Sequence, residues 1–175
     1  MQLKDIHAVV SGGASGLGFA VANRFVLAGG KVTLLDVNQA QGAAAATTLG
    51  DSAAFIATDV TDESAVNDAV DKARQRMGSI NAAVNCAGIA TPLPMARELA
   101  SSGIRVMTVA PGIFATPMMK GLPQEAQDSL GKQTPFPPRL GEPDEYAAMV
   151  AHIMENVMLN GESIRLDGAI RMQPR

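Results

Sequence analysis

The stretch SGGASGLG, residues 11 to 18, follows the apolar run IHAVV at residues 6 to 10. It places Gly12, Gly16 and Gly18 where a strand would turn into a helix. Glycine is needed there because a pyrophosphate reaches the backbone N–H groups of a helix N-terminus only where no Cβ intervenes. The spacing GxxxGxG in this strand–turn–helix context predicts a dinucleotide phosphate site, with a plain tight turn as the alternative.

An acidic residue, Asp36, ends the second apolar run, VTLLD at residues 32 to 36. A carboxylate at this place accepts hydrogen bonds from the adenosine ribose and repels a 2′-phosphate. The glycine turn contains no Lys or Arg, and Val37 follows the acid, so no cation is offered to NADP. Asp36 therefore favours NAD as the cofactor; the alternative is a solvent-facing acid at a strand end.

Short apolar runs alternate with helical patterns through the first half of the chain. The runs are too continuous for half-exposed strands and are typical of a parallel sheet covered on both faces. Residues 16–28 and 62–77 between them have apolar side chains at helical spacing, and glycine follows each segment. We therefore expect an α/β fold with a doubly wound parallel sheet and right-handed crossovers. The expected strands are residues 6–10, 32–36, 53–57 and 80–85.

The second half predicts fewer regular elements. We expect a short helix at residues 95–102, a buried strand at 104–110, a helix starting at Pro143 and a last strand at 162–167. A proline-rich, loop-rich region is expected between residues 111 and 143. Because the 175 residues contain no linker and no internal repeat, one domain spanning residues 1–175 is expected.

The composition restricts partners and compartment. The net charge is −3 and the 14 basic residues are scattered, so neither nucleic acid nor an anionic membrane surface is indicated. No segment approaches the ~20 apolar residues of a membrane span, and the N-terminus lacks a signal-peptide pattern. The one cysteine, Cys86, cannot form an internal disulfide and suits a reducing compartment. We therefore expect a cytoplasmic protein without a metal site.

Several motifs together resemble the short-chain dehydrogenase/reductase family. The glycine turn, Asp36, ATDVTD at 57–62 and NCAG at 85–88 are similar to its cofactor motifs. The later motifs ARELASSGIRVMTVAPGIFATPMM, PFPPRLGEPDEYA and NGESIRLDGAIRM resemble type II 3-hydroxyacyl-CoA dehydrogenases, a branch that also includes 17β-hydroxysteroid dehydrogenases. This resemblance covers nearly the whole chain. It implies a Rossmann-like fold, NAD as the cofactor and a place in fatty acid metabolism.

The resemblance also implies which residues contact NAD. Those on the adenosine side flank the adenine, steady the central strand or line the ribose: Asp59, Val60, Asn85, Ala87 and Gly88. Those on the nicotinamide side are Pro111, Gly112, Ile113 and Thr116. They join Ser11, Gly12, Ser15, Gly16, Leu17, Gly18 and Asp36 in the predicted cofactor set. The alternatives are that Asp59 only caps a turn and that Pro111 and Gly112 form an ordinary one.

Family members also use a Ser, a Tyr and a Lys four residues after the Tyr, which this chain lacks. A phenol with a pKa of about 10 works as an acid or base at neutral pH only if a nearby cation stabilises its anion. The family places these groups in several tens of residues after the NCAG-type motif. Here Gly88 is followed almost at once by PMARELA, the end of the helix that would hold them. We therefore expect an internal deletion at about residues 90–92 and predict no catalytic residue.

No other side chain replaces these groups. The only tyrosine, Tyr146, has Val150 rather than Lys four residues later. His7 lies in a strand and His152 on a late helix, so both are interpreted as structural.

Three interpretations of the function stay open. In the first, the activity of the lineage is NAD-dependent oxidation of a secondary alcohol, either a 3-hydroxyacyl-CoA or a steroid-like substrate. This chain then keeps the cofactor site but does not turn over substrate. It is alternatively a non-catalytic NAD-binding or interaction protein, or an active enzyme whose sequence is given without an internal segment. By the same resemblance, the family strand order 3-2-1-4-5-6-7 would become 3-2-1-4, with the last two strands either joining the sheet or leaving a gap. Residues 89–103 are just long enough for a parallel crossover, which needs about a dozen residues. Losing two covering helices predicts marginal stability or an altered homo-oligomer.

Overall fold

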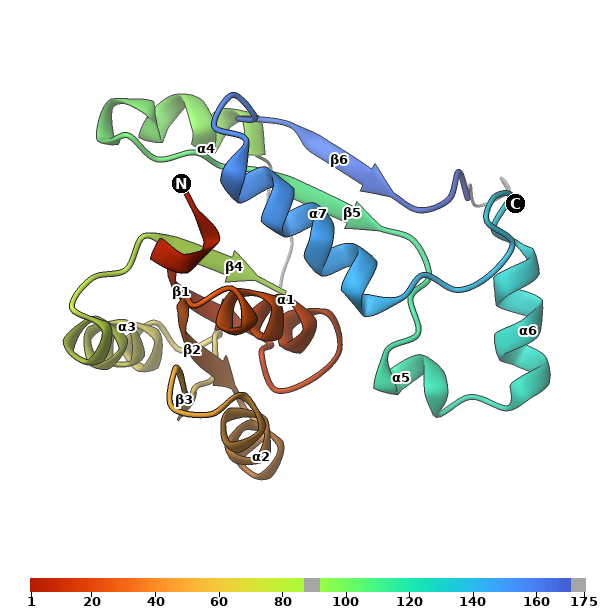
Figure 1. The fold of residues 1–175 in the computed structure, drawn as a ribbon, viewed down its shortest axis with the longest axis horizontal. Helices are drawn as coiled ribbons and strands as arrows, with labels where there is room; N and C mark the ends of the chain where they lie inside the picture. Colours follow the sequence, from red (N-terminus) through yellow and green to blue (C-terminus); the bar gives the residue numbers. More distant parts are fainter. Residues whose placement is uncertain (87–91, 171–175) are drawn as a thin grey trace. The chain divides into compact units, whose positions relative to one another are not determined.

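The computed structural model describes residues 1–86 and 92–170. They belong to two compact units, Met1–Ile89 and Ala90–Arg175, whose elements are drawn in Figure 1. The predicted cofactor residues Ala87 and Gly88, and residues 90 and 91 of the predicted junction, lie outside the described residues. No described helix has the length and apolar character needed to cross a membrane.

The first unit is a parallel sheet whose strands alternate with helices (Figure 1). Its order is β3-β2-β1-β4, and every neighbouring pair is parallel. The predicted α/β fold and the predicted strand order 3-2-1-4 are therefore confirmed. The elements are η1 (Leu3–Asp5), β1 (His7–Ser11), α1 (Gly16–Leu27), β2 (Lys31–Asp36), α2 (Gln39–Leu49), β3 (Ala53–Ala57), α3 (Glu63–Met77) and β4 (Ala82–Asn85).

The strand register brings the predicted site residues of this unit to one edge of the sheet. Ser11 lies beside Leu35 of β2 on one side and beside Asn85 of β4 on the other. Asp36, the next residue of β2, lies beside Ala57 at the end of β3. The carboxyl ends of all four strands thus meet at the edge from which the glycine turn leaves β1, where parallel α/β sheets bind their ligands.

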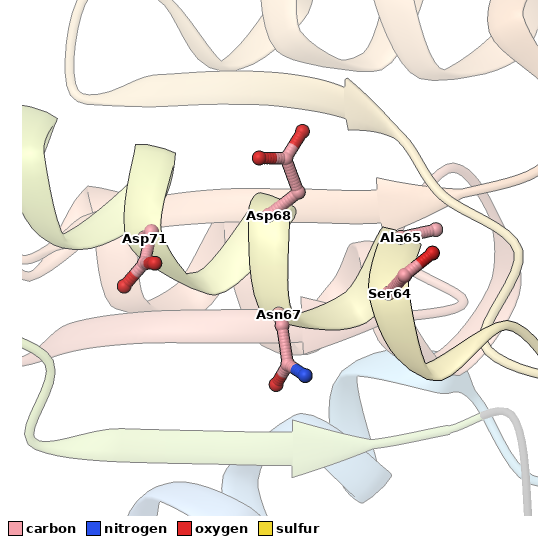
Figure 2. Close-up of a pocket in the computed structure, with 5 residues that line it drawn as sticks. All are labelled: Ser64, Ala65, Asn67, Asp68 and Asp71. Atoms are coloured by element: carbon pink, nitrogen blue, oxygen red, sulfur yellow. The ribbon is translucent and has the colours of Figure 1, made fainter.

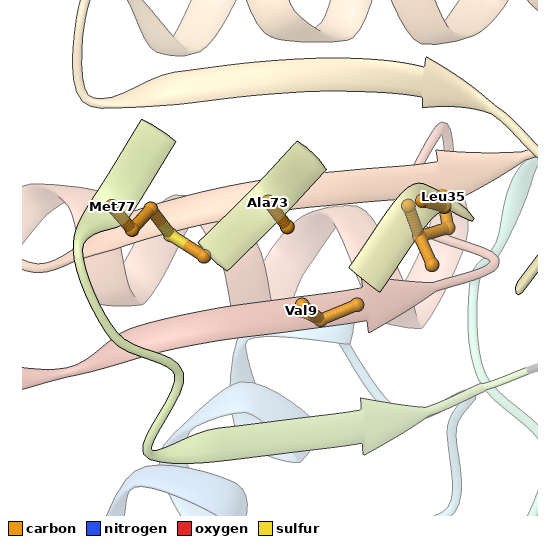
Figure 3. Packing of buried hydrophobic residues seen from close by; sticks show 5 residues of the cluster. Val9, Leu35, Ala73 and Met77 are labelled. Carbon is orange, nitrogen blue, oxygen red and sulfur yellow. The ribbon is translucent and has the colours of Figure 1, made fainter. Parts of the chain in front are cut away.

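One face of the sheet is closed by α3 (Figure 3). Ala69, Ala73 and Met77 recur every fourth residue and pack against Val9 of β1 and Leu35 of β2. All five are buried, and Ile56 and Ile80 pack against the cluster. Burial of this apolar stripe fixes the sequence segment between β3 and β4 as a helix on the sheet.

The second unit has its own two-stranded parallel sheet, in which β5 pairs with β6. Of the two alternatives for the last strands, the one in which they do not join the first sheet is observed. The elements are α4 (Pro92–Leu99), η2 (Ala100–Ser102), β5 (Thr108–Pro111), α5 (Pro117–Lys120), α6 (Gln124–Lys132), α7 (Pro143–Glu155) and β6 (Ser163–Leu166).

The predicted strand of the second unit is wrong in its extent. The strand predicted at residues 104–110 covers only Thr108–Pro111, and the predicted residues are exposed or half-buried because β5 has a single partner strand. The region predicted to be rich in loops, between residues 111 and 143, contains two short helices, α5 and α6, among its loops. Pro117 begins α5, and a proline at the first helical position is compatible with a helix because its missing N–H would have no partner there.

The long helix α7 begins with a reciprocal cap. The side chain of Glu142 accepts from the backbone of Glu145, whose carboxylate accepts the Glu142 N–H at 2.8 Å. At the other end, Arg105 donates to the carbonyl oxygens of Leu159 at 2.7 Å and Asn156 at 3.2 Å. A cation therefore satisfies backbone acceptors just after the C-terminus of α7, where it also suits the helix dipole.

Candidate functional site

The glycine turn has a backbone path that few other residues could follow. Gly12 has φ of 65° and Gly16 has φ of 57°, both in the left-handed region. The Gly12 N–H donates to the Leu35 carbonyl oxygen at 2.9 Å, which ties the turn to the end of β2. The turn is thus a fixed structure held by the neighbouring strand, as a phosphate cradle requires.

Close packing explains two further glycines. A Cβ added at Gly18 would overlap the Gly12 carbonyl oxygen and lie 2.9 Å from its carbon. A Cβ added at Gly13 would lie 2.8 Å from the Val10 carbonyl oxygen. The GxxxGxG spacing did not single out Gly13, and its need for glycine depends on how closely the turn passes over β1. Gly18 therefore lets the first turn of α1 rest directly on the glycine turn.

The N-terminus of α1 has no side-chain cap. Ser15 occupies the N-cap position with extended backbone, but its hydroxyl makes no capping hydrogen bond, and the first turn contains no acid. By contrast, Asn38 caps α2 and Asp62 caps α3. The first N–H groups of a helix need partners, and with the helix dipole they favour an anion. The α1 N-terminus therefore suits a phosphate.

Asp36 links the end of β2 to the glycine turn. Its Oδ2 accepts the Ala14 N–H at 3.2 Å, and its Oδ1 accepts the Asn38 N–H at 3.0 Å. A carboxylate has about four acceptor positions, so two backbone bonds leave it able to accept ribose hydroxyls as well. Asp36 thus holds the loop around the predicted nucleotide site while presenting charge to it.

The remaining predicted residues of the first unit have local partners. Asp59 Oδ1 accepts from the Thr61 N–H at 2.9 Å and from the Thr61 hydroxyl at 2.7 Å, and these bonds hold the pKa of Asp59 below its usual range. Asp59 therefore caps a turn, as the alternative reading had it, and its ionised carboxylate keeps further acceptor positions. Val60 is 40% exposed. The Ser11 hydroxyl donates to Asn85 Oδ1 at 3.3 Å, joining β1 to β4.

The predicted nicotinamide-side residues all lie in the second unit. Pro111 ends β5, the Gly112 N–H donates to the Leu166 carbonyl oxygen at 2.9 Å, and a Cβ at Gly112 would lie 2.7 Å from Asp167 Cα. Thr116 is the N-cap residue of α5. Ile113 lines a small cavity of about 110 Å³, together with Phe114, Thr134, Pro137, Arg139, Gly141, Glu145, Leu166, Asp167 and Gly168.

An ion pair lines this cavity. The two terminal nitrogens of Arg139, Nη1 and Nη2, donate to the Glu145 carboxylate at 2.8 Å each. The hydrogen bonds from Arg139 lower the pKa of Glu145 to about 2. Because Glu145 also accepts the Glu142 N–H, the pair anchors the start of α7 and is engaged with the fold rather than with a ligand.

A larger surface hollow lies along α3 and does not coincide with the predicted site (Figure 2). Its lining consists of Ser64, Ala65, Asn67, Asp68 and Asp71. Asp68 is paired with Lys72 and Asp71 with Arg74 on the surface of the helix. Its lining contains none of the predicted cofactor residues, so the hollow is not part of the predicted site.

Two of the residues weighed as replacement catalytic groups, Tyr146 and His7, have partners within the fold. The Tyr146 side chain is buried, with its ring edge-on to Phe114 at a centroid distance of 6.1 Å. His7 Nδ1 lies 3.0 Å from the Ser79 hydroxyl. Within residues 1–86 and 92–170, no group of three or more His, Cys, Asp or Glu side chains could hold a metal ion.

Family comparisons agree with this geometry. Residues 6–95 match the model described as short chain dehydrogenase, and residues 93–169 match the one described as Enoyl-(Acyl carrier protein) reductase. The chain belongs to the short-chain dehydrogenase family. The first match contains the glycine turn, Asp36 and Asp59.

Individual relatives extend the similarity over the whole chain. The 3-hydroxyacyl-CoA dehydrogenase type-2 of Bos taurus is 36% identical over 255 residues, covering 99% of this chain and 98% of the relative. A crystal structure of 3-hydroxyacyl-CoA dehydrogenase type-2 from Mycobacterium avium has a TM-score of 0.89 at 29% identity, with 96% of each chain covered. A 3-ketoacyl-(acyl-carrier-protein) reductase from Brucella melitensis, solved with NADH, shares the fold at 22% identity and a TM-score of 0.84, covering 93% and 96% of the two chains.

The length of the first alignment bears on the predicted deletion. It spans 255 positions, whereas this chain has 175 residues, so about 80 aligned positions have no residue of this chain opposite them. Since both ends of the relative are covered, these positions are internal to it. This supports the expectation that a segment of several tens of residues is missing from the chain.

Proposed function

We propose that this chain binds NAD through its first unit and does not itself carry out the alcohol oxidation of its lineage. The observation that carries the proposal is the pair of Asp36 hydrogen bonds, which hold a carboxylate beside a glycine turn and an uncapped helix N-terminus. Such a set of groups fits the ribose and pyrophosphate of an adenine dinucleotide.

Each part of the site has a distinct task in binding. The first N–H groups of α1 would bind the pyrophosphate, and Gly18 lets the turn approach closely enough for them to be reached. Asp36 would accept the ribose hydroxyls, and Asp59 the adenine amino group. The predicted contacts of Pro111, Gly112, Ile113 and Thr116 with the nicotinamide remain part of the proposal.

Chemistry needs groups that this chain does not supply. Bound NAD offers a hydride acceptor, but oxidation of a secondary alcohol also needs a base to remove the hydroxyl proton. The only tyrosine is Tyr146; it is buried against Phe114 and has Val150 where the family has Lys. A phenol with a pKa of about 10 acts as a base at neutral pH only if a cation, such as the family's Lys, stabilises its anion. We therefore propose NAD binding without turnover.

The relatives' names guide the proposed substrate class of the lineage. They are called 3-hydroxyacyl-CoA dehydrogenases type-2, so the active form of this sequence would oxidise a 3-hydroxyacyl-CoA or a similar secondary alcohol. A cytoplasmic location, expected from the composition, belongs to the same proposal. If the full enzyme contains a further internal segment, that longer chain would be catalytic and this one its cofactor-binding remainder.

Binding and turnover can be tested on the same preparation. Asp36→Ala is expected to weaken NAD binding at least tenfold, because it removes the ribose acceptor and frees the glycine turn. Asp51→Ala changes an exposed acid in the turn before β3; it serves as the matched control and should bind like the unaltered chain. NADH formation from 3-hydroxybutyryl-CoA should stay at the background rate. Turnover at a rate typical of enzymes would disprove the non-catalytic reading, and equal NAD affinity of the Asp36 variant would disprove the site.

A further inference from the structure

The segment between α7 and β6 contains the one Asn-Gly pair of the sequence, Asn160–Gly161. Asparagine is a chemically labile residue, because the backbone nitrogen of the next residue can attack its side-chain carbonyl carbon. Glycine hinders this attack least, since it has no Cβ. Every other asparagine of the chain is followed by a residue that has a side chain. Asn160 is therefore the asparagine whose neighbour obstructs the attack least.

The fold requires the glycine of this pair. Gly161 has φ of 78°, in the left-handed region that disfavours a side chain. A Cβ added there would lie 3.2 Å from Leu93 Cδ1 and 3.5 Å from Ala96 Cβ, both on α4. The close passage of α4 thus keeps a glycine after Asn160, and with it the unhindered nitrogen.

One residue holds both reacting groups. The Val106 N–H donates to Asn160 Oδ1 at 2.9 Å, and the Gly161 N–H donates to the Val106 carbonyl oxygen at 2.8 Å. We call these two hydrogen bonds the Val106 clamp. For attack, the Gly161 nitrogen must lose its proton and the Asn160 carboxamide must turn toward it, so both bonds of the clamp must open. The folded chain therefore restrains the reaction that its sequence invites.

Arg105 supports the clamp from the neighbouring position. Its guanidinium donates to the carbonyl oxygens of Leu159 at 2.7 Å, Asn156 at 3.2 Å and Met154 at 3.2 Å. Leu159 directly precedes Asn160 in the chain, so this cation holds the segment that leads into the Asn-Gly pair. All these contacts lie within the second unit.

We propose that Asn160 is a site of deamidation and isoaspartate formation, and that opening of the Val106 clamp sets its rate. In the first step the Gly161 nitrogen loses its proton and bonds to Asn160 Cγ. The bond from Cγ to the side-chain nitrogen breaks, and that nitrogen leaves as ammonia with the proton. Water then adds to either carbonyl of the resulting five-membered imide and opens it to aspartate or isoaspartate. The sequence of steps consumes one water and requires no oxidant or reductant.

The isoaspartate product should not fit the clamp. It routes the backbone through the former side-chain carbon, which lengthens the chain by one atom and leaves a carboxylate beside it. The clamp lies just before the β5–β6 ladder, where the Thr108 N–H donates to the Glu162 carbonyl oxygen at 3.0 Å and Thr108 pairs with Ser163. Isoaspartate formation should therefore loosen the start of this ladder, and the change accumulates with the age of the protein.

The reactivity of the pair can be measured without the fold. The chain is incubated at neutral pH in guanidinium chloride, and peptide mapping by mass spectrometry follows Asn, Asp and isoaspartate at position 160. Asn156, which precedes Val157, is the reference within the same chain. Position 160 should react at least about tenfold faster than Asn156, and Gly161→Ala should remove most of this difference. Equal rates at the two positions would overturn the proposed site.

The effect of the clamp is measured by the same mapping on the folded chain. Since only the open clamp reacts, the folded rate at position 160 should be at least about tenfold below the rate in denaturant. Arg105→Ala should raise the folded rate severalfold. Arg24→Ala, which removes an exposed arginine from α1 of the other unit, is the matched control and should leave the rate unchanged. A folded rate equal to the denatured rate would overturn the role of the clamp.

Hydrogen exchange on aged, unaltered protein gives a test that needs no variant, which matters if Arg105→Ala fails to fold. The fraction carrying isoaspartate at position 160 is separated by ion exchange and compared with the unmodified fraction. The Thr108 amide should exchange faster in the modified fraction, whereas the Val9 amide of β1 should exchange alike in both. Equal protection of Thr108 in the two fractions would contradict the proposed loosening of the ladder.

Discussion

Gly18→Ala is the substitution that most sharply tests the geometry of the glycine turn. A Cβ at this position would overlap the Gly12 carbonyl oxygen and lie 2.9 Å from the carbonyl carbon and 3.2 Å from Gly13 Cα. All three atoms are backbone, so no flexible side chain can move aside. Either α1 must retreat from the turn or the turn must open.

The magnitude follows from two opposing effects. Overpacking of this kind costs about 1–3 kcal/mol, and here the obstacle is backbone, which places the cost at the upper end. Alanine is about 1 kcal/mol better than glycine inside a helix, and Gly18 lies in the first turn of α1. The net loss in the free energy of unfolding is therefore about 2 kcal/mol, or a fall of roughly 4–8 °C in the midpoint for a chain of this size. Displacing one N–H from the phosphate should also weaken NAD binding by about 1.5–3 kcal/mol, which lowers the NAD affinity about 10- to 100-fold.

Thermal unfolding by circular dichroism and calorimetric NAD titration measure the two effects. Gly121→Ala is the control, since Gly121 has a right-handed helical backbone and a Cβ there would come no closer than 3.5 Å to any neighbour. That control should be neutral or slightly stabilising. A Gly18→Ala protein with an unchanged midpoint and unchanged NAD affinity would refute the proposed close packing of α1 on the turn.

Three other substitutions test separate parts of the account. Asp36→Asn removes the negative charge facing the adenosine ribose, so the preference for NAD over NADP should fall by about tenfold or more, equivalent to about 1.4 kcal/mol. Paired titrations with NAD and NADP measure this preference, and an unchanged ratio of the two affinities would contradict the role assigned to Asp36. Glu145 has its pKa lowered from 4.5 to about 2 by Arg139, so the ion pair stabilises the fold above pH 4.5 and loses this contribution as the pH falls towards 2. The side chains are nearly half exposed, so Glu145→Gln should remove less than about 1 kcal/mol of acid-dependent stability in unfolding experiments across this range, and the prediction fails if the two proteins share one pH profile. Met77→Ala should cost about 2–5 kcal/mol because Met77 is buried between α3 and the sheet; a midpoint within error of the unaltered protein would argue against that packing.

The first unit could be predicted from the sequence because its signals are local. The glycine turn, the acid 18 residues after Gly18 and the apolar runs each depend on neighbours within one strand–helix pair. The order 3-2-1-4 followed from the family resemblance that these motifs carry. Two details of this unit are seen only in the structure. Gly13 is required by the approach of Val10 and Leu34, and the turn at Asp59 is closed by Thr61, contacts that spacing alone does not reveal.

The second unit was predicted less well because its strands depend on what lies beside them. A continuous apolar stretch such as residues 104–110 is typical of a strand buried between neighbours, but here β5 pairs with β6 alone and only Thr108–Pro111 forms a ladder. Prolines between residues 111 and 143 suggested loops, although Pro117 begins α5. Whether residues 1–175 unfold as a single cooperative domain stays a prediction.

Calorimetric titration of NAD into the purified 175-residue chain tests the central claim most directly. The first unit retains the glycine turn, the uncapped α1 N-terminus and Asp36, so the titration should saturate with one NAD per chain. No detectable binding at millimolar NAD would contradict the account, because the cofactor site would then be lost together with the missing segment.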